Sequence, residues 1–115
     1  MRPIVVTASD ATSGVKYTDL VRLDEWTTGG VGVQITVTGT VNYTLQQTMD
    51  DPNSNTNPVA VGSMAWVNSA DTNVVGATAT KQTNYQFCPV FCRVALNSGS
   101  GSVTATFVQS GVTNL

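Results

Sequence analysis

The fold of this chain is decided by residues 31–46, which read VGVQITVTGTVNYTLQ. Odd-numbered positions of this stretch are apolar except at Gly39, and even-numbered positions are polar or glycine. A period of two is typical of strands that have one buried and one solvated face. Because the apolar positions keep the same parity on both sides of Gly39, we expect Val37 opposite Val41 across an odd turn, with Gly39 in the left-handed conformation. The stretch therefore predicts a β-hairpin over residues 31–49.

A second alternating pattern lies near the end of the chain. Apolar side chains occupy every second position from 92 to 96 and from 103 to 107, and the intervening residues 97–102 read NSGSGS. A turn without apolar side chains between two such runs predicts a second hairpin over residues 90–110. The side chains predicted to face the core are Val33, Ile35, Val37, Val41, Tyr43, Leu45, Val94, Leu96, Val103, Ala105 and Phe107.

Composition extends this reading to the whole chain. Val and Thr contribute 18 residues each to the 115, and both are β-branched and favour strands. Weaker strand patterns occur at residues 3–8, 17–23, 62–67 and 77–83. No stretch has a helical period, and the length suits one domain. The sequence therefore predicts an all-β fold: a single antiparallel β-sandwich or jelly-roll-like domain of about eight short strands over residues 1–115.

The charge content argues against several classes of function. The chain has five Lys and Arg residues, seven Asp and Glu residues and no His. So few cations cannot neutralise the phosphates of a nucleic-acid footprint. Without His, the usual general base and the commonest zinc ligand are missing. No apolar run reaches the length of a membrane span or signal peptide, so we expect a protein made in a cytoplasm that does not bind a membrane. From the charge content we also expect no nucleic-acid partner, no metal and no cofactor.

Two cysteines, Cys88 and Cys92, stand four positions apart. In an extended strand this separation is about 13 Å, beyond the Cα distance that a disulfide spans. A bridge would need a tight turn at Pro89. We expect two buried, unbridged thiols that pack as small apolar groups.

The longest polar stretch covers residues 50–58 and contains Asp50, Asp51, Asn53 and Asn55. Its oxygen atoms are of the kind that calcium takes, but the spacing of a calcium-binding loop is absent. A pair of aspartates that starts a turn before a proline is the simpler interpretation. Neighbouring carboxylates on a strand also point to opposite faces, which makes them a poor acid–base pair.

Three further side chains have two interpretations each. Trp26, next to Asp24 and Glu25, either covers an open end of the sandwich or forms a platform for a sugar ring. Trp66 occupies an apolar strand position and is predicted, with Phe107, to lie in the core. Arg93 stands on a well-patterned strand and is expected either to pack its stem over Thr or aromatic surface or to form a salt bridge between subunits.

The order of several short motifs resembles a group of small tailed-bacteriophage proteins. The motifs are GTVNYTLQ at 39–46, DDP at 50–52, Trp66, NY at 84–85, PV at 89–90, Arg93 and GSGSVTATFVQSG at 99–111. The resemblance as a whole covers roughly residues 31–111, and Cys88 and Cys92 are not part of the pattern. The resemblance implies a small β-sandwich component of a virion, such as a capsid decoration (cement) protein or another head or tail accessory protein. It supplies no catalytic motif.

We therefore expect a non-enzymatic virion structural protein, assembled in the host cytoplasm. Its expected partners are the major capsid protein and neighbouring copies of itself, with a homotrimer as one arrangement. A tail or adaptor accessory protein and a carbohydrate-binding β-sandwich module are the alternatives, the latter requiring an exposed aromatic ring beside carboxamides. The residues predicted to contact partners are Arg2, Pro3, Ile4, Asp50, Asp51, Asn53, Asn55, Arg93, Val112 and Leu115.

Overall fold

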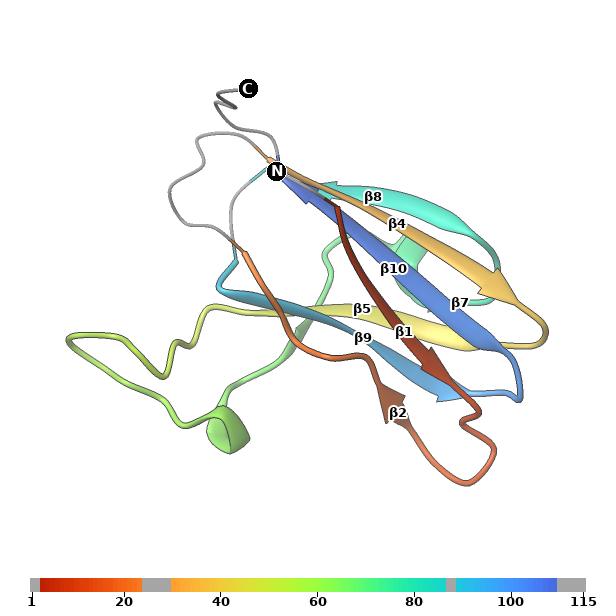
Figure 1. Cartoon of the computed structure of the whole chain (residues 1–115), viewed down its shortest axis with the longest axis horizontal. Coiled ribbons are helices and arrows are strands. Elements are labelled where there is room, and N and C mark those ends of the chain that lie inside the picture. The colour runs from red at the N-terminus through yellow and green to blue at the C-terminus, as the bar shows by residue number, and fades with distance from the viewer. Residues whose placement is uncertain (1–2, 24–29, 87–88, 110–115) are drawn as a thin grey trace.

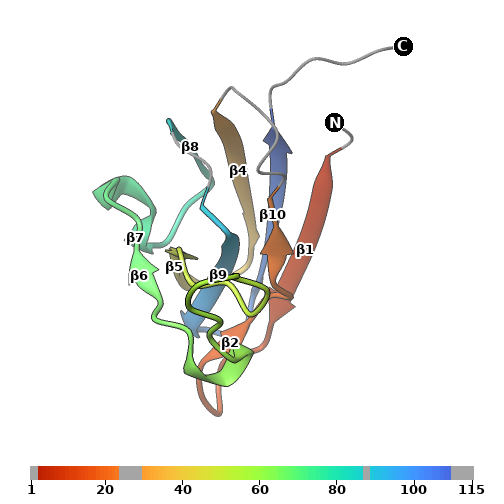
Figure 2. The same cartoon turned by 90° about the vertical axis from the view of Figure 1, so that its left-hand side faces the viewer.

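The computed structural model describes residues 3–23, 30–86 and 89–109, which form a two-layered β structure (Figures 1 and 2). The strands are β1 (Ile4–Ser9), β2 (Lys16–Tyr17), β3 (Val21–Arg22), β4 (Val31–Thr38), β5 (Asn42–Thr48), β6 (Val67–Asn68), β7 (Val75–Ala77), β8 (Lys81–Tyr85), β9 (Phe91–Ser98) and β10 (Ser102–Gln109). Two short 3-10 turns are η1 (Val61–Ser63) and η2 (Thr72–Val74). Several residues singled out by the sequence lie outside the described residues: Arg2, Asp24, Glu25, Trp26, Cys88, Val112 and Leu115.

The strands form two antiparallel sheets. The first has the order β1-β10-β4-β8, and the second has the order β2-β9-β5-β6, with β3 also paired to β9 and β7 to β5. β2 and β3 follow one edge of β9 in nearly the same register, so they act as one interrupted strand. β6 and β7 likewise lie along one edge of β5, but η2 separates them and their registers differ. The result confirms an all-β sandwich with about eight strand positions.

The connections give this sandwich the topology of a jelly roll. When β2–β3 and β6–β7 are each counted as one interrupted strand, the described chain passes from one sheet to the other at every step except from β5 to β6, which share the second sheet. This alternation between two sheets is the arrangement of eight-stranded jelly rolls.

Both predicted hairpins are therefore wrong, although their strands are correct. β4 pairs with β10 and β8, whereas β5 pairs with β9, β6 and β7. Likewise, β9 and β10 lie in different sheets. Alternation defines which side of a strand faces the core, but not which strand it pairs with. Two consecutive strands with the same parity can bury their apolar sides as a hairpin in one sheet, or equally well by facing each other across the sandwich.

The predicted inward-facing side chains do form the core between the sheets. Ten of the eleven are buried, and Val37 is half-buried against the same cluster. Tyr43, Phe107 and Ile35 are the largest of the fully buried side chains. Gly39 has φ +77°, which confirms its predicted left-handed conformation. Cys92 is fully buried, as predicted.

The weaker strand predictions are partly correct. The expected strand at 3–8 is β1, but the one at 17–23 divides into β2 and β3. Between these two, Thr18 still bonds to β9, because its amide donates to the Val94 carbonyl at 3.0 Å and its hydroxyl accepts from the Val94 amide at 3.0 Å. The segment 62–67 is mostly η1 and loop, and 77–83 contains the end of β7 and the start of β8.

Candidate functional site

A long loop joins β5 to β6 and extends from one end of the second sheet (Figure 1). Its first residues fold back on themselves through Asp51. The Asp51 carboxylate accepts a hydrogen bond from the Asn53 amide at 2.9 Å, and the Asp51 carbonyl accepts from the amides of Ser54 and Val59 at 3.3 and 3.1 Å. This is the turn expected from an aspartate placed before a proline.

Arg22 of β3 anchors this turn to the sheet. Its two terminal nitrogens donate to the two carboxylate oxygens of Asp51, each at 3.2 Å. The Arg22 guanidinium also lies over the Phe91 ring, 5.2 Å from its centroid. Hydrogen bonds from Arg22 and then from the Asn53 amide hold the pKa of the Asp51 carboxyl below its ordinary value.

Asp50 is used differently from its neighbour. Its carboxylate accepts a hydrogen bond from the Ala65 amide at 2.7 Å, and its own amide donates to the Thr48 hydroxyl at 3.1 Å. Asp50 thus ties the start of the loop to its end, whereas Asp51 ties the loop to β3. Both carboxylates hold the loop in place, which confirms the turn interpretation of this pair.

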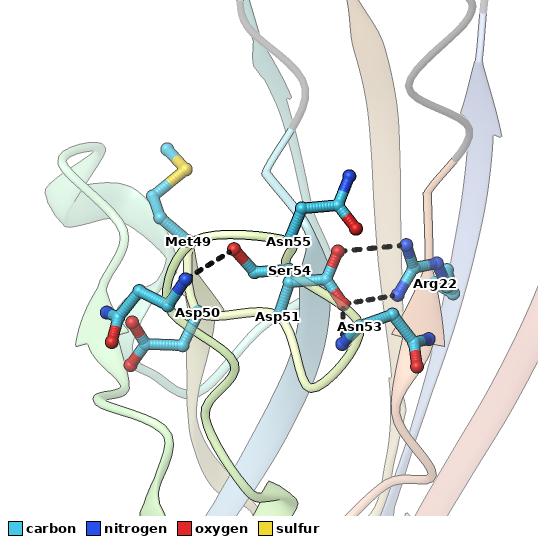
Figure 3. Close-up of a pocket in the computed structure, with 8 residues that line it drawn as sticks. Arg22, Met49, Asp50, Asp51, Asn53, Ser54 and Asn55 are labelled. Atoms are coloured by element: carbon cyan, nitrogen blue, oxygen red, sulfur yellow. Dashed lines mark hydrogen bonds and ion pairs between the residues drawn. The ribbon is translucent and has the colours of Figure 1, made fainter.

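The anchored loop encloses a polar cavity of about 530 Å³ (Figure 3). Its lining residues are Arg22, Met49, Asp50, Asp51, Asn53, Ser54, Asn55 and Asn57. Ser54 stabilises the far side, because its hydroxyl accepts from the amides of Thr56 and Asn57 at 3.3 and 3.1 Å. The three asparagine side chains are exposed. Since carboxamides both donate and accept hydrogen bonds, the cavity is suited to binding neutral polar groups.

A second cluster lies on the outer surface of the same sheet, around Arg93 of β9. The Arg93 guanidinium carbon is 4.0 Å from the centroid of the Tyr17 ring and 4.2 Å from that of the Trp66 ring. Its Nε donates to the Gln46 side chain at 2.9 Å, and Gln46 donates in turn to Asn68 at 3.0 Å. Burial between the rings lowers the pKa of Arg93.

This cluster bears on both Arg93 and Trp66. Arg93 packs over aromatic surface, as one of its two interpretations expects, and the salt bridge between subunits stays a prediction. Trp66 is half-buried on the outside of the sheet rather than in the core, because it follows the long loop and reaches Arg93 from beyond β5. Phe107, by contrast, is fully buried as predicted.

The outer surface of the first sheet forms a third feature, which we call the threonine face. Strand alternation directs its side chains away from the core. The face comprises Val5, Thr7, Ser9, Gly32, Gln34, Thr36, Thr38, Gln82, Asn84, Ser102, Thr104, Thr106 and Val108. None of these residues is charged. Because Gly32 lacks a side chain, a hollow of about 240 Å³ lies beside Val108, bordered by Gln82 on β8.

The predicted contact residues are thus distributed over separate places. Asp50, Asp51, Asn53 and Asn55 line the loop cavity together. Arg93 lies on the outer surface of the second sheet, whereas Pro3 is exposed and Ile4 is half-buried at the start of β1 in the first sheet.

Sequence reasoning missed Arg22 and Tyr17 as parts of these clusters. A polar residue in a broken strand pattern carries no sign of a partner, and Asp51 is 29 positions from Arg22. Arg22 and Asp51 come together only because β3 and β5 both pair with β9.

No family model, curated protein or solved structure matches this chain. Within the described residues, no helix has the length and apolar character needed to cross a membrane. The same residues contain no group of three or more His, Cys, Asp or Glu side chains that could hold a metal ion.

Proposed function

We propose that this chain is a non-enzymatic structural protein of a tailed-bacteriophage virion, and specifically a capsid decoration protein that bridges capsid subunits. The observation that carries the proposal is the threonine face, a four-stranded surface without a charged side chain. Covering such a surface removes no ion from water, so association has a smaller desolvation cost than it would for a surface of Lys and Glu. The jelly-roll topology supports the same class less specifically, since viral capsid proteins use this fold but lectins and cupins use it too.

The hollow at Gly32 gives the proposed contact a specific shape. An apolar side chain of the capsid protein would enter it beside Val108, while the surrounding hydroxyls and carboxamides would bond at the rim. The loop cavity with Asn53 and Asn55 would provide a second, more polar contact with the capsid.

Two substitutions test the threonine face. Gly32→Val would fill the hollow, and its new Cβ would be 3.7 Å from the Val108 carbonyl oxygen, an ordinary contact that leaves the strand intact. Gln34→Lys would place a charge in the middle of the face. We expect both variants to fold normally and to occupy phage heads at about a tenth of the wild-type level or less, measured by quantitative electrophoresis of purified particles.

Ser63→Lys serves as the control, because it adds the same charge at an exposed residue of η1, away from this sheet. Normal occupancy by Gly32→Val and Gln34→Lys would contradict docking through the threonine face. Absence of wild-type protein from particle heads would contradict the decoration function, and its presence on tails would favour a tail or adaptor role.

Binding through this face predicts a weak response to salt, since there are few ion pairs for salt to screen. We expect wild-type protein to stay on particles in about 0.5 M NaCl, well above physiological ionic strength. We also expect deletion of residues 1–4 or 112–115 to leave a folded domain with weaker particle binding. Release by modest salt would contradict docking through the uncharged face. Normal decoration by truncated protein would remove the terminal segments from consideration.

A carbohydrate-binding module is the second candidate, favoured by the cluster around Arg93. Tyr17 is 52% exposed and Trp66 is partly exposed, and both rings lie against the Arg93 guanidinium, which donates to the Gln46 carboxamide. Aromatic rings beside amides are groups that hold sugar rings. Quenching of tryptophan fluorescence by neutral glycans, lost in Trp66→Ala, would support this function. Absence of any glycan response with wild-type protein would exclude it.

A further inference from the structure

The border of the first sheet formed by β1 is unusual among the sheet edges of this molecule. β1 runs unbroken through six residues, reads IVVTAS and carries no charge. Among the described residues it pairs only with β10, and Figure 2 shows it at the border of its layer. Natural sheets normally protect such an edge with charges, prolines or bulges, because an open edge pairs with other strands.

The other three edges have these protections. The β8 edge carries Lys81, and the β2–β3 edge carries Lys16 and Arg22 and is interrupted. The β6–β7 edge is interrupted by η2. Only β1 thus presents an uncharged and continuous row of backbone groups within the described residues.

The hydrogen bonding of Asp10 shows which backbone groups of β1 are open. Its amide donates to the Gly101 carbonyl at 3.1 Å, one step beyond the pairing of Ser9 with Ser102. Backbone groups alternate in direction along an antiparallel strand. The amides and carbonyls of Val5, Thr7 and Ser9 therefore point away from β10, toward the free edge.

We propose that β1 pairs antiparallel with β1 of a second copy of this chain, which makes a dimer with one sheet continuous across a two-fold axis. Thr7 lies on the axis and bonds to Thr7 of the other copy, and Val5 bonds to Ser9. The strand is self-complementary in this register because it carries no charge, whereas β8 carries Lys81.

The pairing also continues the two faces of the sheet. On the inner side, Val6 and Ala8, which point toward the core, lie opposite Ala8 and Val6 of the other copy. On the outer side, the two threonine faces join. This inference does not rest on the proposed function, because the pairing is a property of the free protein. A two-fold contact also differs from the expected homotrimer.

Sedimentation equilibrium of the free protein over a range of concentrations tests the pairing. We expect a mass that rises from 12.0 kDa toward twice that value. Thr7→Pro removes an amide that points to the free edge and keeps every β1–β10 backbone bond, so it should raise the dimer dissociation constant by about tenfold or more. A thermal melt of the variant confirms that the domain is folded.

Gln82→Pro is the matched control at the opposite edge. The Val37 amide of β4 donates to the Thr80 hydroxyl at 3.2 Å, so by the same alternation the Gln82 amide points away from β4. We expect this variant to dimerise like wild type. Equal weakening by both variants, a monomer at all concentrations or a trimer would overturn the proposal.

Amide hydrogen exchange identifies the edge directly. The amides of Val5, Thr7 and Ser9 should gain protection as the concentration rises, whereas those of Val6 and Ala8 should be protected at all concentrations. Protection of the first three that is independent of concentration would assign the edge to another segment of the same chain. A dimer that leaves them unprotected would place the interface elsewhere, and either result overturns the pairing.

Discussion

Single side chains hold the loop of this jelly roll against its second sheet. The Asp51 carboxylate accepts hydrogen bonds from both terminal nitrogens of Arg22, and the Arg22 guanidinium lies over the Phe91 ring. Two parallel N–H···O bonds constrain geometry more than one, which is why arginine suits such anchors. The Arg22–Asp51 ion pair therefore fixes the loop cavity to β3, while Asp50 and Ser54 fix the rest of the loop.

The Arg22–Asp51 pair predicts a specific dependence of stability on pH. The pKa of the Asp51 carboxyl is lowered from 3.8 in the folded chain, so its contribution to stability is present above that value and is lost as pH falls through the lower folded pKa. We expect Asp51→Asn to melt below wild type at pH 7, with the difference shrinking below about pH 4.

Asp19→Asn is the control for this measurement, since Asp19 is exposed and forms no salt bridge among the described residues. Its melting temperature should follow wild type across the pH range. A difference between Asp51→Asn and wild type that persists unchanged at acid pH would contradict the role of the ionised carboxylate.

A second prediction at this scale concerns Cys92, whose side chain is fully buried in the core. Cys92→Ala removes a sulfur from a packed site and should cost about 1–2 kcal/mol in the free energy of unfolding. Urea denaturation with and without reductant measures this cost. A loss of several kcal/mol that occurs only under oxidising conditions would instead indicate a disulfide.

At the scale of elements, two turns that cross between the sheets determine the topology. The turn from β4 to β5 contains Gly39, and the turn from β9 to β10 contains Gly99 and Gly101. They pack against each other, because the Gly101 amide donates to the Thr40 carbonyl at 2.9 Å. Backbone meets backbone at this point, so side chains have no room.

Substitutions at these glycines should therefore be costly. Gly99 has φ +107°, and a Cβ there would lie 2.2 Å from the Thr40 carbonyl oxygen. We expect Gly99→Ala to lose about 2–4 kcal/mol of unfolding free energy through backbone strain and overpacking. Gly62→Ala, where a Cβ meets nothing within 4 Å, should change stability by less than about 1 kcal/mol. Similar urea midpoints for the two variants would show that the turns are not tightly packed.

On the scale of the whole molecule, the jelly roll has few local strand pairs. Within the described residues, the one pair of consecutive strands that hydrogen-bond to each other, β5 and β6, is separated by a long loop. Almost all pairing must therefore wait for distant segments to meet, at the cost of closing long loops.

This topology predicts slow folding. We expect refolding in milliseconds to seconds or slower, about as observed for other all-β sandwiches with non-local pairing. Stopped-flow tryptophan fluorescence after dilution from urea measures the rate. Complete refolding within microseconds would require local hairpins to form first, in conflict with the observed strand order.

The sequence by itself determined the all-β class, the inward side of the main strands and the turn at Asp51. Each of these follows from local chemistry: β-branched alternation marks the buried side, Gly39 permits a left-handed turn, and an aspartate before a proline caps its own loop. Only the tertiary structure decided which strands pair, because the same alternation suits a hairpin and a crossing between sheets. It also decided that Arg22 meets Asp51, that Trp66 lies outside the core and that the uncharged positions of four strands form one face. These features join residues distant in sequence, and no local pattern encodes such contacts.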